Sequence, residues 1–357
     1  MSLVGAAESA AAPVRIGALG TSAIANRRAL PAMVASDAVE LTAVAGRDEG
    51  RTKEFAGRFG CAADTYDGLL QRDDVDAVYV SVPTSLHVPW AERALRAGKH
   101  VLVEKPAGVA AAEVGDLVRL AAERGLVLRE NYMFLHHPQH QRVRALVAEG
   151  RLGTLRSFHG AFCIPPLPAD DIRYDESLGG GALLDLGVYP LRAARLVLGE
   201  RLAVAGATMR VRESDGLDLS GQALLTSASG VLVTVDYGFE HDYGQSYALW
   251  GSRARLSVDR PFTPPPAYQP RLVLEEQDHG ERFTLPPADQ LAHGIAGFAR
   301  AVQAAAAGTA GGASADPVEA DWRAAALETT ELVDQVRELA VRVTADARTT
   351  GDAAGEG

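Results

Sequence analysis

The sequence predicts an α/β fold in which an N-terminal doubly wound parallel sheet precedes a C-terminal α+β domain with a large open, mainly antiparallel sheet. Short apolar runs alternate with helical segments over residues 14–131, which is typical of a parallel sheet covered on both faces. Beyond Gly199, runs that alternate apolar and polar residues indicate an antiparallel sheet with one covered and one exposed face. The chain has 357 residues, a length that suits two domains.

Five buried strands are expected in the first domain, residues 14–131. They are VRIGALG (14–20), VELTAVAG (39–46), DAVYVSVP (76–83), KHVLVEKP (99–106) and LVLREN (126–131). The segments between them have helical spacing: IANRRALPAMVAS, RTKEFAGRFG, VPWAERALRAG and VAAAEVGDLVRLAAERG. Repetition of strand and helix in this way indicates parallel strands joined by crossover helices.

The second domain is expected to span residues 132–345, with residues 1–13 and 346–357 as flexible tails. A helix in HPQHQRVRALVAEG, a strand in TLRSFHGAF and a Pro-rich loop, CIPPLPADDIRYDES, open it. The sheet is expected from LAVAGATMRVR, SGQALLTSA, GVLVTVDYGFE, SYALWG, ARLSVD, RLVLEE and ERFTL. Two helices, near 288–307 and 317–345, flank the loop GTAGGASADP, and the last helix could pack back on the first domain.

Charge and composition exclude several kinds of partner. The formal net charge is −11 and no block of basic residues could follow a phosphate backbone, so no nucleic acid is expected. No stretch approaches the ~20 apolar residues that span a bilayer. The first residues also lack the basic region of a signal peptide, so we expect a cytoplasmic protein without membrane contact. No metal is expected, because neither Cys61 nor Cys163 has partners at ligand spacing and His136, His137 and His140 are interpreted as packing.

A glycine turn follows the first strand and is expected to bind the pyrophosphate of a dinucleotide. It reads Gly20-Thr21-Ser22-Ala23-Ile24-Ala25. Gly20 and Ala25 match the pattern G-x-G-x-x-G/A, and Ser22 stands at its second glycine. Because the turn opens a helix in the first strand–helix–strand unit, its N–H groups would hold the phosphates. A tight turn without a ligand is the alternative.

The end of the second strand indicates which nicotinamide cofactor binds. An acidic residue there usually bonds the ribose 2′-hydroxyl of NAD, whereas an arginine suits the 2′-phosphate of NADP. Arg47 stands at this point, and Arg51 follows one helical turn later. Asp48 is acidic but lies one residue late. NADPH/NADP is therefore favoured over NAD, with a solvated Arg47 as the alternative.

The fourth strand ends in Glu104-Lys105-Pro106, at the edge where doubly wound sheets bind their ligands. Lys105 is a candidate catalytic cation, and a surface lysine that caps a helix is the alternative. Further cofactor contacts are expected at the ends of the third and fourth strands, from Pro83, Thr84, His87, Glu104 and Lys105.

The segments VEKP (103–106) and GGGALLDLGVYP (179–190) together resemble the Gfo/Idh/MocA oxidoreductase family, over most of the chain from residue 14 to about residue 340. That resemblance implies a Rossmann domain joined to an α/β domain whose open sheet forms the subunit interface. A homodimer or homotetramer through the sheet is therefore expected. The resemblance also implies hydride transfer between nicotinamide and a sugar or cyclitol carbon.

Tyr189 stands where many members of this family carry a histidine. Together, five segments resemble the nucleotide-sugar 3-ketoreductases of deoxysugar and antibiotic biosynthesis: ENYMFLHHPQH, DIRY, GGGALLDLGVYPLRAAR, FTPPPAYQP and QDH followed by FTLP. This resemblance implies NADPH-dependent reduction of the C3 ketone of a dTDP-3,4-diketo-2,6-dideoxyhexose.

Ketone reduction needs a hydride on carbon and a proton on the developing alkoxide. Tyr189 is the candidate general acid, because a phenol with a pKa near about 10 is protonated at neutral pH. Lys105 is expected to polarise the carbonyl and to lower the pKa of Tyr189. Asp185 would orient the lysine or bind a sugar hydroxyl. The alternatives are a Tyr189 ring in the core and an Asp185 charge at a helix N-terminus.

Pro190 predicts that the helix of this segment kinks or begins around Tyr189, because proline lacks a backbone donor and disfavours α geometry in the preceding residue. The glycines at 179–181 are expected to let the backbone pass close to substrate and nicotinamide. In the Pro-rich loop, Arg173 and Tyr174 are expected to bind the diphosphate and the thymine of the substrate. Both could equally be surface residues of a loop.

Two other functions remain open. The first is a dehydrogenase of the same family that acts on a free sugar, a cyclitol or a trans-dihydrodiol. Arg173 should distinguish it, because a free sugar has no diphosphate to bind. The second is a non-catalytic NAD(P)-binding regulator, and the presence of both Lys105 and Tyr189 argues against it.

Overall fold

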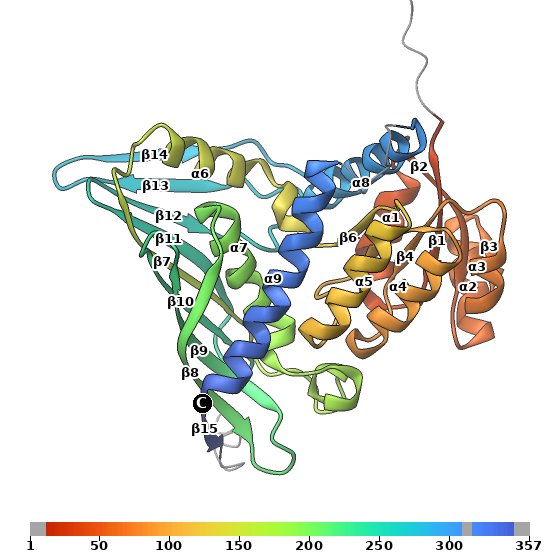
Figure 1. Cartoon of the computed structure of the whole chain (residues 1–357), viewed down its shortest axis with the longest axis horizontal. Coiled ribbons are helices and arrows are strands. Elements are labelled where there is room, and N and C mark those ends of the chain that lie inside the picture. Colours follow the sequence, from red (N-terminus) through yellow and green to blue (C-terminus); the bar gives the residue numbers. More distant parts are fainter. Residues whose placement is uncertain (1–11, 309–315, 346–357) are drawn as a thin grey trace, which may run out of the picture.

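The computed structural model describes residues 12–308 and 316–345, which form two sheets with helices between and beside them (Figure 1). Within these residues the N-terminal sheet has six strands and the C-terminal sheet has nine. The first is parallel and the second mostly antiparallel, which confirms the predicted fold class. Most of the predicted tails, and most of the loop predicted at 308–317, lie outside the described residues.

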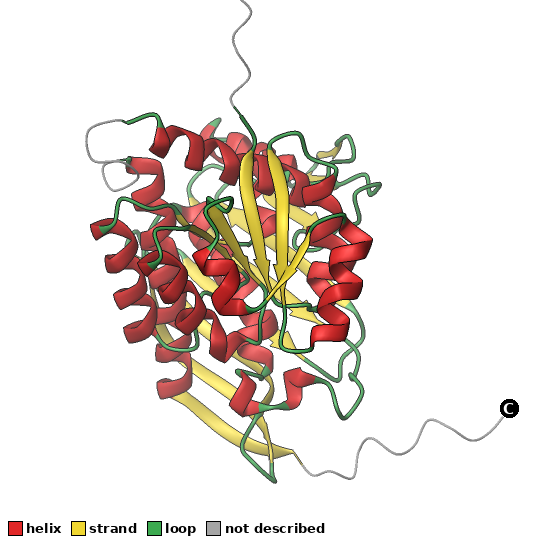
Figure 2. Cartoon of the chain, turned by 90° about the vertical axis from the view of Figure 1, so that its right-hand side faces the viewer, coloured by secondary structure: helices red, strands yellow, loops and turns green. Residues whose placement is uncertain are grey.

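The six-stranded sheet has the order β3-β2-β1-β4-β5-β6. Its strands are β1 (Val14–Leu19), β2 (Val39–Ala45), β3 (Ala62–Asp64), β4 (Ala77–Val80), β5 (His100–Val103) and β6 (Leu128–Glu130). Helices lie on both sides of it (Figure 2), so β4 is fully buried and reads as a continuous apolar run. The chain order reverses between β1 and β4, and ligands bind at such a point. The sequence pattern does not predict β3, because AAD contains no apolar run.

The helices around this sheet come from both ends of the chain. They are α1 (Leu30–Val34), α2 (Glu49–Phe59), α3 (Tyr66–Gln71), α4 (His87–Arg96), α5 (Ala111–Glu123), α8 (Gln290–Ala306) and α9 (Pro317–Leu339). Ile295 and Phe298 of α8 are buried in one apolar cluster with Ile16 of β1 and Leu30 of α1. The helix α9 packs on α5 and β6. Both helices at the end of the chain therefore pack against the first domain. The sequence suggests this packing only for the last of them.

The nine-stranded sheet has the order β14-β13-β12-β11-β7-β10-β9-β8-β15. Its strands are β7 (Leu155–Cys163), β8 (Leu202–Arg212), β9 (Asp218–Ser227), β10 (Leu232–Gly238), β11 (Gly244–Gly251), β12 (Arg255–Asp259), β13 (Arg271–Glu275), β14 (Gly280–Thr284) and β15 (Ala340–Ala345). The pairs β7–β10 and β8–β15 are parallel, and the other neighbouring pairs are antiparallel. The helices α6 (Pro138–Ala148) and α7 (Val188–Leu198) belong to the same half of the molecule.

The predicted helix at 317–345 is wrong in its last residues. The helix α9 ends at Leu339, and residues 340–345 pair with β8 as the edge strand β15. The segment AVRVTA alternates and contains three β-branched residues, which favours a strand once an unpaired sheet edge is available. The side chains of Val341 and Val343 remain exposed on this edge strand.

The nine-stranded sheet has one covered and one open face. The helices α7 and α9 lie between the covered face and the first domain (Figure 1). Phe158, Val233 and Tyr247 are buried beneath them in the larger apolar core. On the opposite face, Leu224, Leu232 and Trp250 are 57%, 61% and 51% exposed. A row of exposed apolar side chains on a sheet is typical of a surface that binds another protein.

Three further features concern partners and bonds. In the part of the chain that the structure describes, no helix is long and apolar enough to cross a membrane. The same residues contain no cluster of three or more His, Cys, Asp or Glu side chains that could hold a metal ion. Cys61 and Cys163 are both free thiols.

Candidate active site

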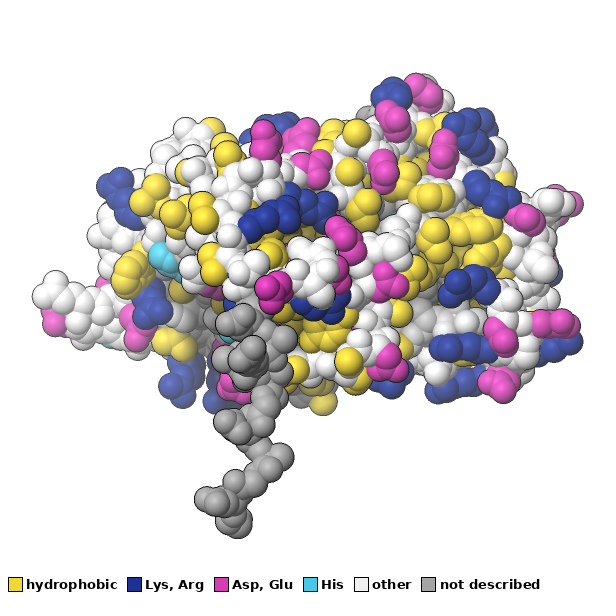
Figure 3. Space-filling model, turned by 90° about the horizontal axis from the view of Figure 1, so that it is seen from below, with side chains coloured by type: hydrophobic (Ala, Val, Ile, Leu, Met, Phe, Trp, Pro, Cys, Tyr) yellow, Lys and Arg dark blue, Asp and Glu magenta, His cyan; other side chains and the backbone are white. Residues whose placement is uncertain are grey.

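A cleft of about 590 Å³ lies at the carboxyl ends of β1, β2 and β4. It is lined by Gly20, Thr21, Ser22, Ala23, Arg47, Asp48, Arg51, Tyr66, Ser81, Val82, Pro83 and Ile172. The structure thus brings together seven of the residues that the sequence suggests for the cofactor. On the surface that contains this end of the first domain, apolar side chains gather with Lys and Arg side chains around them (Figure 3).

The glycine turn after β1 has the geometry that a dinucleotide requires. Gly20 has a φ of +103°, and a Cβ on it would lie 2.5 Å from the carbonyl oxygen of Ser81. A side chain at this position would therefore collide with the end of β4. Ser22, at the second glycine of the pattern, accepts a hydrogen bond from Ala25 N through its Oγ (3.1 Å). Its hydroxyl thereby closes the first turn of the following helix.

Asp48, the acidic residue near the expected ribose position, already caps the helix that follows it. Asp48 caps α2 and accepts a hydrogen bond from Arg51 N through Oδ1 (2.7 Å). The side chains of Arg47 and Arg51 line the cleft on either side of it. Two guanidinium groups beside a capped carboxylate suit a 2′-phosphate better than a bare 2′-hydroxyl. The residues present therefore fit NADP(H).

Five of the suggested cofactor residues lie outside the lining of the cleft, and Lys105 is one of them. Ile24 packs against the apolar core of the first domain. The ring nitrogens of His87 contact the carbonyl oxygens of Pro106 (2.7 Å) and Val82 (2.9 Å). Burial lowers the pKa of His87 to about 4, so the ring is neutral and links two strand-end loops. Thr84 lies against Gly179.

Glu104, another of these residues, faces into the first domain. Its Oε1 accepts hydrogen bonds from the hydroxyl of Tyr79 (2.6 Å) and from Nδ2 of Asn131 (2.7 Å). Burial raises the pKa of this carboxyl despite both bonds. The network joins β4 to the ends of β5 and β6, and it fixes the backbone directly before Lys105.

Lys105 and Asp185 form a mostly buried ion pair between the two halves of the molecule. The Nζ atom of Lys105 donates to Oδ1 of Asp185 (2.9 Å) and to its carbonyl oxygen (2.8 Å). The other carboxylate oxygen, Oδ2, accepts from Nε of Arg173 (2.8 Å). The ammonium also lies 5.1 Å from the ring centroid of Tyr189. Four residues that the sequence suggests for catalysis and substrate binding therefore meet in one cluster.

The pKa values in this cluster follow from burial and pairing. Burial opposes the charge of Lys105, but Asp185 and Tyr189 outweigh it, so the pKa of Lys105 is raised and the ammonium persists. Burial likewise opposes the charge of Asp185, yet Lys105 and Arg173 hold the pKa of this carboxyl below its usual value.

The Lys105 ammonium lowers the pKa of Tyr189, as the sequence suggests, but the net shift of this pKa is upward. Burial raises the pKa of Tyr189 by more than the Lys105 ammonium lowers it. The nearby carboxylate of Asp185 adds to the rise, because it offsets much of the lysine's positive field. Tyr189 is consequently a phenol well into the alkaline range, and it remains a proton donor.

The ring of Tyr189 lies in an aromatic environment. Its centroid is 5.7 Å from that of Tyr132, 5.2 Å from Phe162 and 5.5 Å from Phe262, and the residue is 5% exposed. Among the described residues, no hydrogen bond joins its hydroxyl to a protein group, and this oxygen is not one of the fully buried atoms without a partner. The ring is thus fixed by core packing, as the alternative from the sequence suggests, while the hydroxyl is available to a substrate.

The helix changes form directly before Tyr189, close to where Pro190 predicts a kink or a beginning, because α7 begins at Val188. A π-helical turn spans Leu183–Gly187 and continues directly into α7, where Tyr189 is helical. A π turn widens the helix locally, which accommodates a residue without an N–H group. The turn also carries Asp185, and such turns are frequent at functional sites.

Asp218, at the start of β9, fixes the beginning of this helix. Its Oδ2 accepts a hydrogen bond from Leu183 N (2.6 Å). A Cβ on Gly181, whose φ is +107°, would collide with Oδ1 of the same carboxylate. A Cβ on Gly179, whose φ is +79°, would lie 2.8 Å from Ser85 N, so this loop lies close to the first domain. The glycines therefore allow close approach to protein backbone and to Asp218, and the expected approach to substrate and nicotinamide stays a prediction.

The loop before the glycines directs its residues in opposite directions. Ile172 lines the cofactor cleft, and Nη1 of Arg173, whose side chain is 43% exposed, also pairs with Asp171 (3.1 Å). The hydroxyl of Tyr174 instead accepts a hydrogen bond from Leu167 N (3.2 Å), and its ring packs on Phe239. Tyr174 therefore anchors the loop.

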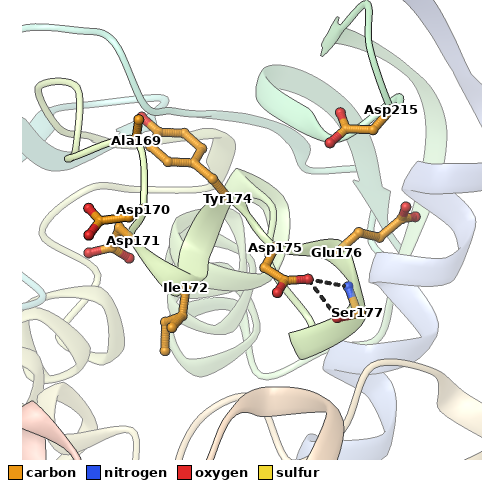
Figure 4. A pocket seen from close by; sticks show the side chains of 9 residues that line it. All are labelled: Ala169, Asp170, Asp171, Ile172, Tyr174, Asp175, Glu176, Ser177 and Asp215. Atoms are coloured by element: carbon orange, nitrogen blue, oxygen red, sulfur yellow. Dashed lines mark hydrogen bonds between the residues drawn. The ribbon is translucent and has the colours of Figure 1, made fainter.

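The far side of this loop borders a second space, of about 460 Å³, that is strongly acidic. Asp170, Asp171, Asp175, Glu176 and Asp215 line it, with Ile172 and Tyr174 pointing to opposite sides (Figure 4). Asp175 accepts hydrogen bonds from the N–H and hydroxyl of Ser177 (Figure 4). So many carboxylates would repel an anionic ligand, which makes this space unsuitable for a diphosphate.

Two family models match the chain. The first, described as an oxidoreductase family with an NAD-binding Rossmann fold, matches residues 14–132. The second, the GFO/IDH/MocA C-terminal domain, matches residues 140–257. Together they cover well over half of the sequence.

Curated and solved relatives agree with these matches. The chain is 50% identical over 291 residues to a dTDP-3,4-didehydro-2,6-dideoxy-alpha-D-glucose 3-reductase of Actinomadura kijaniata, covering 81% of this chain and 88% of the relative. A reductase of the same name from Streptomyces violaceoruber is 48% identical, and the match covers 92% of this chain and 95% of the relative. The crystal structure of KijD10, a 3-ketoreductase from A. kijaniata with NADP and TDP-benzene, matches with a TM-score of 0.87 at 47% identity, covering 94% of this chain and 100% of that one. Structures of KijD10 with a Tyr→Phe or a Lys→Ala substitution also match.

Proposed function

The chain belongs to the GFO/IDH/MocA oxidoreductase family, and from that premise we propose that it is an NADPH-dependent 3-ketoreductase of dTDP-linked 3,4-diketo-2,6-dideoxyhexoses in deoxysugar biosynthesis. One observation carries the proposal. Lys105 and Tyr189, a buried cation and a phenol with an unbonded hydroxyl, meet beside a cleft whose arginines suit NADP. The names of the similar reductases and of KijD10 support the choice of substrate.

The chemistry divides between cofactor and protein. NADPH bound in the cleft supplies the hydride to the C3 carbonyl carbon. The ammonium of Lys105 donates a hydrogen bond to the carbonyl oxygen and stabilises the negative charge that develops there. Tyr189 transfers its proton to this oxygen, and the phenolate formed is stabilised by the same ammonium until solvent reprotonates it. Asp185 holds Lys105 in place through Oδ1.

Arg173 is assigned to the substrate diphosphate. Its guanidinium is partly exposed at the edge of the catalytic cluster and is held there by Asp185 and Asp171. A bidentate contact from an arginine is well matched to a phosphate. We do not assign thymine binding to Tyr174, because its hydroxyl is bonded within the loop and its ring packs on Phe239.

The Arg173→Gln variant is expected to raise the KM for the dTDP-ketosugar by about 10–100-fold, since a hydrogen bond between charged groups contributes roughly 1.5–3 kcal/mol. The Kd for NADPH, measured by fluorescence titration, should change less than about threefold. Arg173→Lys should restore part of the affinity, because it keeps the charge but loses the planar fork. An unchanged KM in a folded Arg173→Gln enzyme would contradict the assignment.

The Arg47→Ala/Arg51→Ala double variant is expected to weaken NADPH binding by about 10–100-fold while changing NADH binding by less than about twofold. The reason is that NADH lacks the 2′-phosphate that these guanidinium groups would bind. Titration of both cofactors against the variant and the wild-type protein provides the comparison. Equal losses for NADPH and NADH would overturn the assignment of Arg47 and Arg51.

A panel of substrates tests the proposed function against its alternatives. NADPH oxidation is followed with a dTDP-linked 3-keto sugar, free keto sugars and, in the reverse direction with NADP, cyclitols and trans-dihydrodiols. We expect rapid turnover with the nucleotide-linked ketone. Turnover restricted to free substrates would favour a dehydrogenase of another specificity. Tight NADPH binding without turnover on any of them would favour the regulator.

The division of labour that we propose assigns cofactor binding to residues 14–131, and substrate binding and assembly to residues 132–345. The exposed apolar side chains of the open sheet support a homodimer or homotetramer. Because the reaction consumes NADPH, we place it in the cytoplasm.

A Leu232→Arg/Trp250→Arg variant is expected to shift the molar mass measured by light scattering towards the monomer. The same mass for variant and wild type would contradict assembly through this face.

A further inference from the structure

Glu130 connects the loop of Lys105 to the second half of the molecule. It ends β6, and its side chain is 1% exposed. Its Oε1 accepts a hydrogen bond from the backbone N–H of Ala107 (2.8 Å), two residues after Lys105. The carboxylate therefore holds the backbone of the Lys105 loop from beneath, without lining the cofactor cleft.

Arg192 is the partner of Glu130 on the helix of Tyr189. It lies three residues after Tyr189 on α7, which is about one helical turn. Its Nη1 is 4.0 Å from Oε2 of Glu130, and the side chain is 4% exposed. The guanidinium lies over the ring of Tyr132, at 5.5 Å from its centroid, and donates to Oγ1 of Thr329 on α9 (3.3 Å).

The two charges depend on each other. Burial raises the pKa of Glu130 and lowers the pKa of Arg192, so both charged forms are costly in isolation. Within the described residues, Oε2 of Glu130 has no hydrogen bond. Its compensation is the guanidinium of Arg192, which places an electrostatic constraint between β6 and α7.

We propose that Glu130 and Arg192 form a positioning bridge that sets the separation of Lys105 and Tyr189, a role that rests on the proposed function. One end of the bridge is two residues from Lys105, and the other is one helical turn from Tyr189. Asp185 fixes the ammonium of Lys105 through a direct hydrogen bond. The position of the Tyr189 phenol depends instead on the position of α7. A displacement of about 1 Å between reacting groups can lower a rate about a hundredfold, so such a bridge affects catalysis without touching substrate.

The neighbouring residue supplies a matched control. Arg129 pairs with Glu319, and both side chains are buried, at 9% and 2% exposed. This pair joins the same strand, β6, to α9. Its link to Arg192 is the ring of Trp322, over which both guanidinium groups lie. Glu319→Gln therefore removes a charge from a buried ion pair of the same kind and keeps Arg129 and Trp322 in place.

The test compares Glu130→Gln, Arg192→Lys and the control Glu319→Gln in the full-length enzyme. Glutamine keeps an acceptor for Ala107 N and loses the charge, and lysine keeps the charge and loses the planar group. We expect kcat to fall at least tenfold in the first two, with the KM and the Kd for NADPH within about threefold. Glu319→Gln should lower the Tm to a similar extent and keep kcat within twofold.

Two outcomes overturn the bridge. One is a kcat within twofold of wild type in both Glu130→Gln and Arg192→Lys. The other is an equal loss of kcat in Glu319→Gln, which would indicate general loosening. A wild-type enzyme without turnover overturns the proposed function instead. The bridge is then decided by crystal structures of Glu130→Gln and wild type, in which the 5.1 Å separation of Lys105 Nζ and the Tyr189 ring should change. An unchanged separation contradicts it.

Discussion

Replacing Lys105 with methionine is expected to lower kcat for ketone reduction by about a hundredfold or more. Loss of one preorganised donor to a developing oxyanion typically costs a factor of about 10²–10³ in kcat. Methionine keeps most of the volume of the side chain and leaves Asp185 paired with Arg173. Since Lys105 does not line the cleft, the Kd for NADPH should change less than about fivefold.

Lys99 provides the control for this variant, because it stands before the amino end of the same strand. Its Nζ donates to the carbonyl oxygens of Arg72 and Val75, far from the cluster at the other end of β5. Lys99→Met should keep kcat within twofold while losing some stability. Similar kcat values for Lys105→Met and wild type, with NADPH binding intact, would rule out the assigned role of Lys105.

Tyr189→Phe is expected to lower kcat by about 10²–10³-fold, since a positioned general acid contributes roughly 10²–10⁴. The ring contacts with Phe162 and Phe262 are kept, so folding and cofactor binding should persist. Tyr237→Phe serves as the control, because it removes another buried hydroxyl from the same core. A Tyr189→Phe enzyme with full turnover would show that the proton comes from elsewhere.

The pH dependence of the wild-type rate should reflect the raised pKa of Tyr189. A group whose pKa lies above its usual value of about 10 keeps its proton throughout the range in which most assays are made. The kcat should therefore show no loss from deprotonation of the acid between pH 7 and about pH 9. A fall of kcat with a midpoint near neutral pH would indicate that the field of Lys105 dominates after substrate binds.

Residues at strand ends could be predicted from the sequence because their position follows from local pattern. A continuous apolar run identifies β4 and β5, and the chain beyond each must reach the ligand-binding edge. Lys105, the glycine turn at Gly20 and the pair Arg47 and Arg51 were accessible in this way. The short strand β3 and the edge strand β15 were not, because one lacks an apolar run and the other follows the helix α9 without a turn signal between them.

Residues that contact the site through the topology of the chain had no local signal. Asp218 reads as the polar start of a strand, and its role depends on β9 passing beneath the helix that begins near Gly181. Ile172 reads as a loop residue, yet the fold places it in the cofactor cleft with Tyr66, Ser81 and Val82. A large apolar residue in a Pro-rich loop was the hint that the sequence offered.

The sign of a pKa shift is a further property that sequence could not supply. Proximity to Lys105 suggests a lowered pKa for Tyr189, but the balance depends on how deeply the ring is buried. It also depends on Asp185, whose carboxylate offsets the ammonium. Similarly, His87 stands at a strand end but is turned towards the carbonyl oxygens of Pro106 and Val82.

Transfer of deuterium from the cofactor tests the central claim most directly. The enzyme is incubated with NADPH deuterated at C4 of the nicotinamide and with the dTDP-linked 3,4-diketo-2,6-dideoxyhexose, and the product is examined by NMR and mass spectrometry. We predict one deuterium on C3 of the hexose, with a hydroxyl on the same carbon and the dTDP group intact. Deuterium on C4 of the hexose, or no deuterium in the sugar despite bound NADPH, would contradict a 3-ketoreductase.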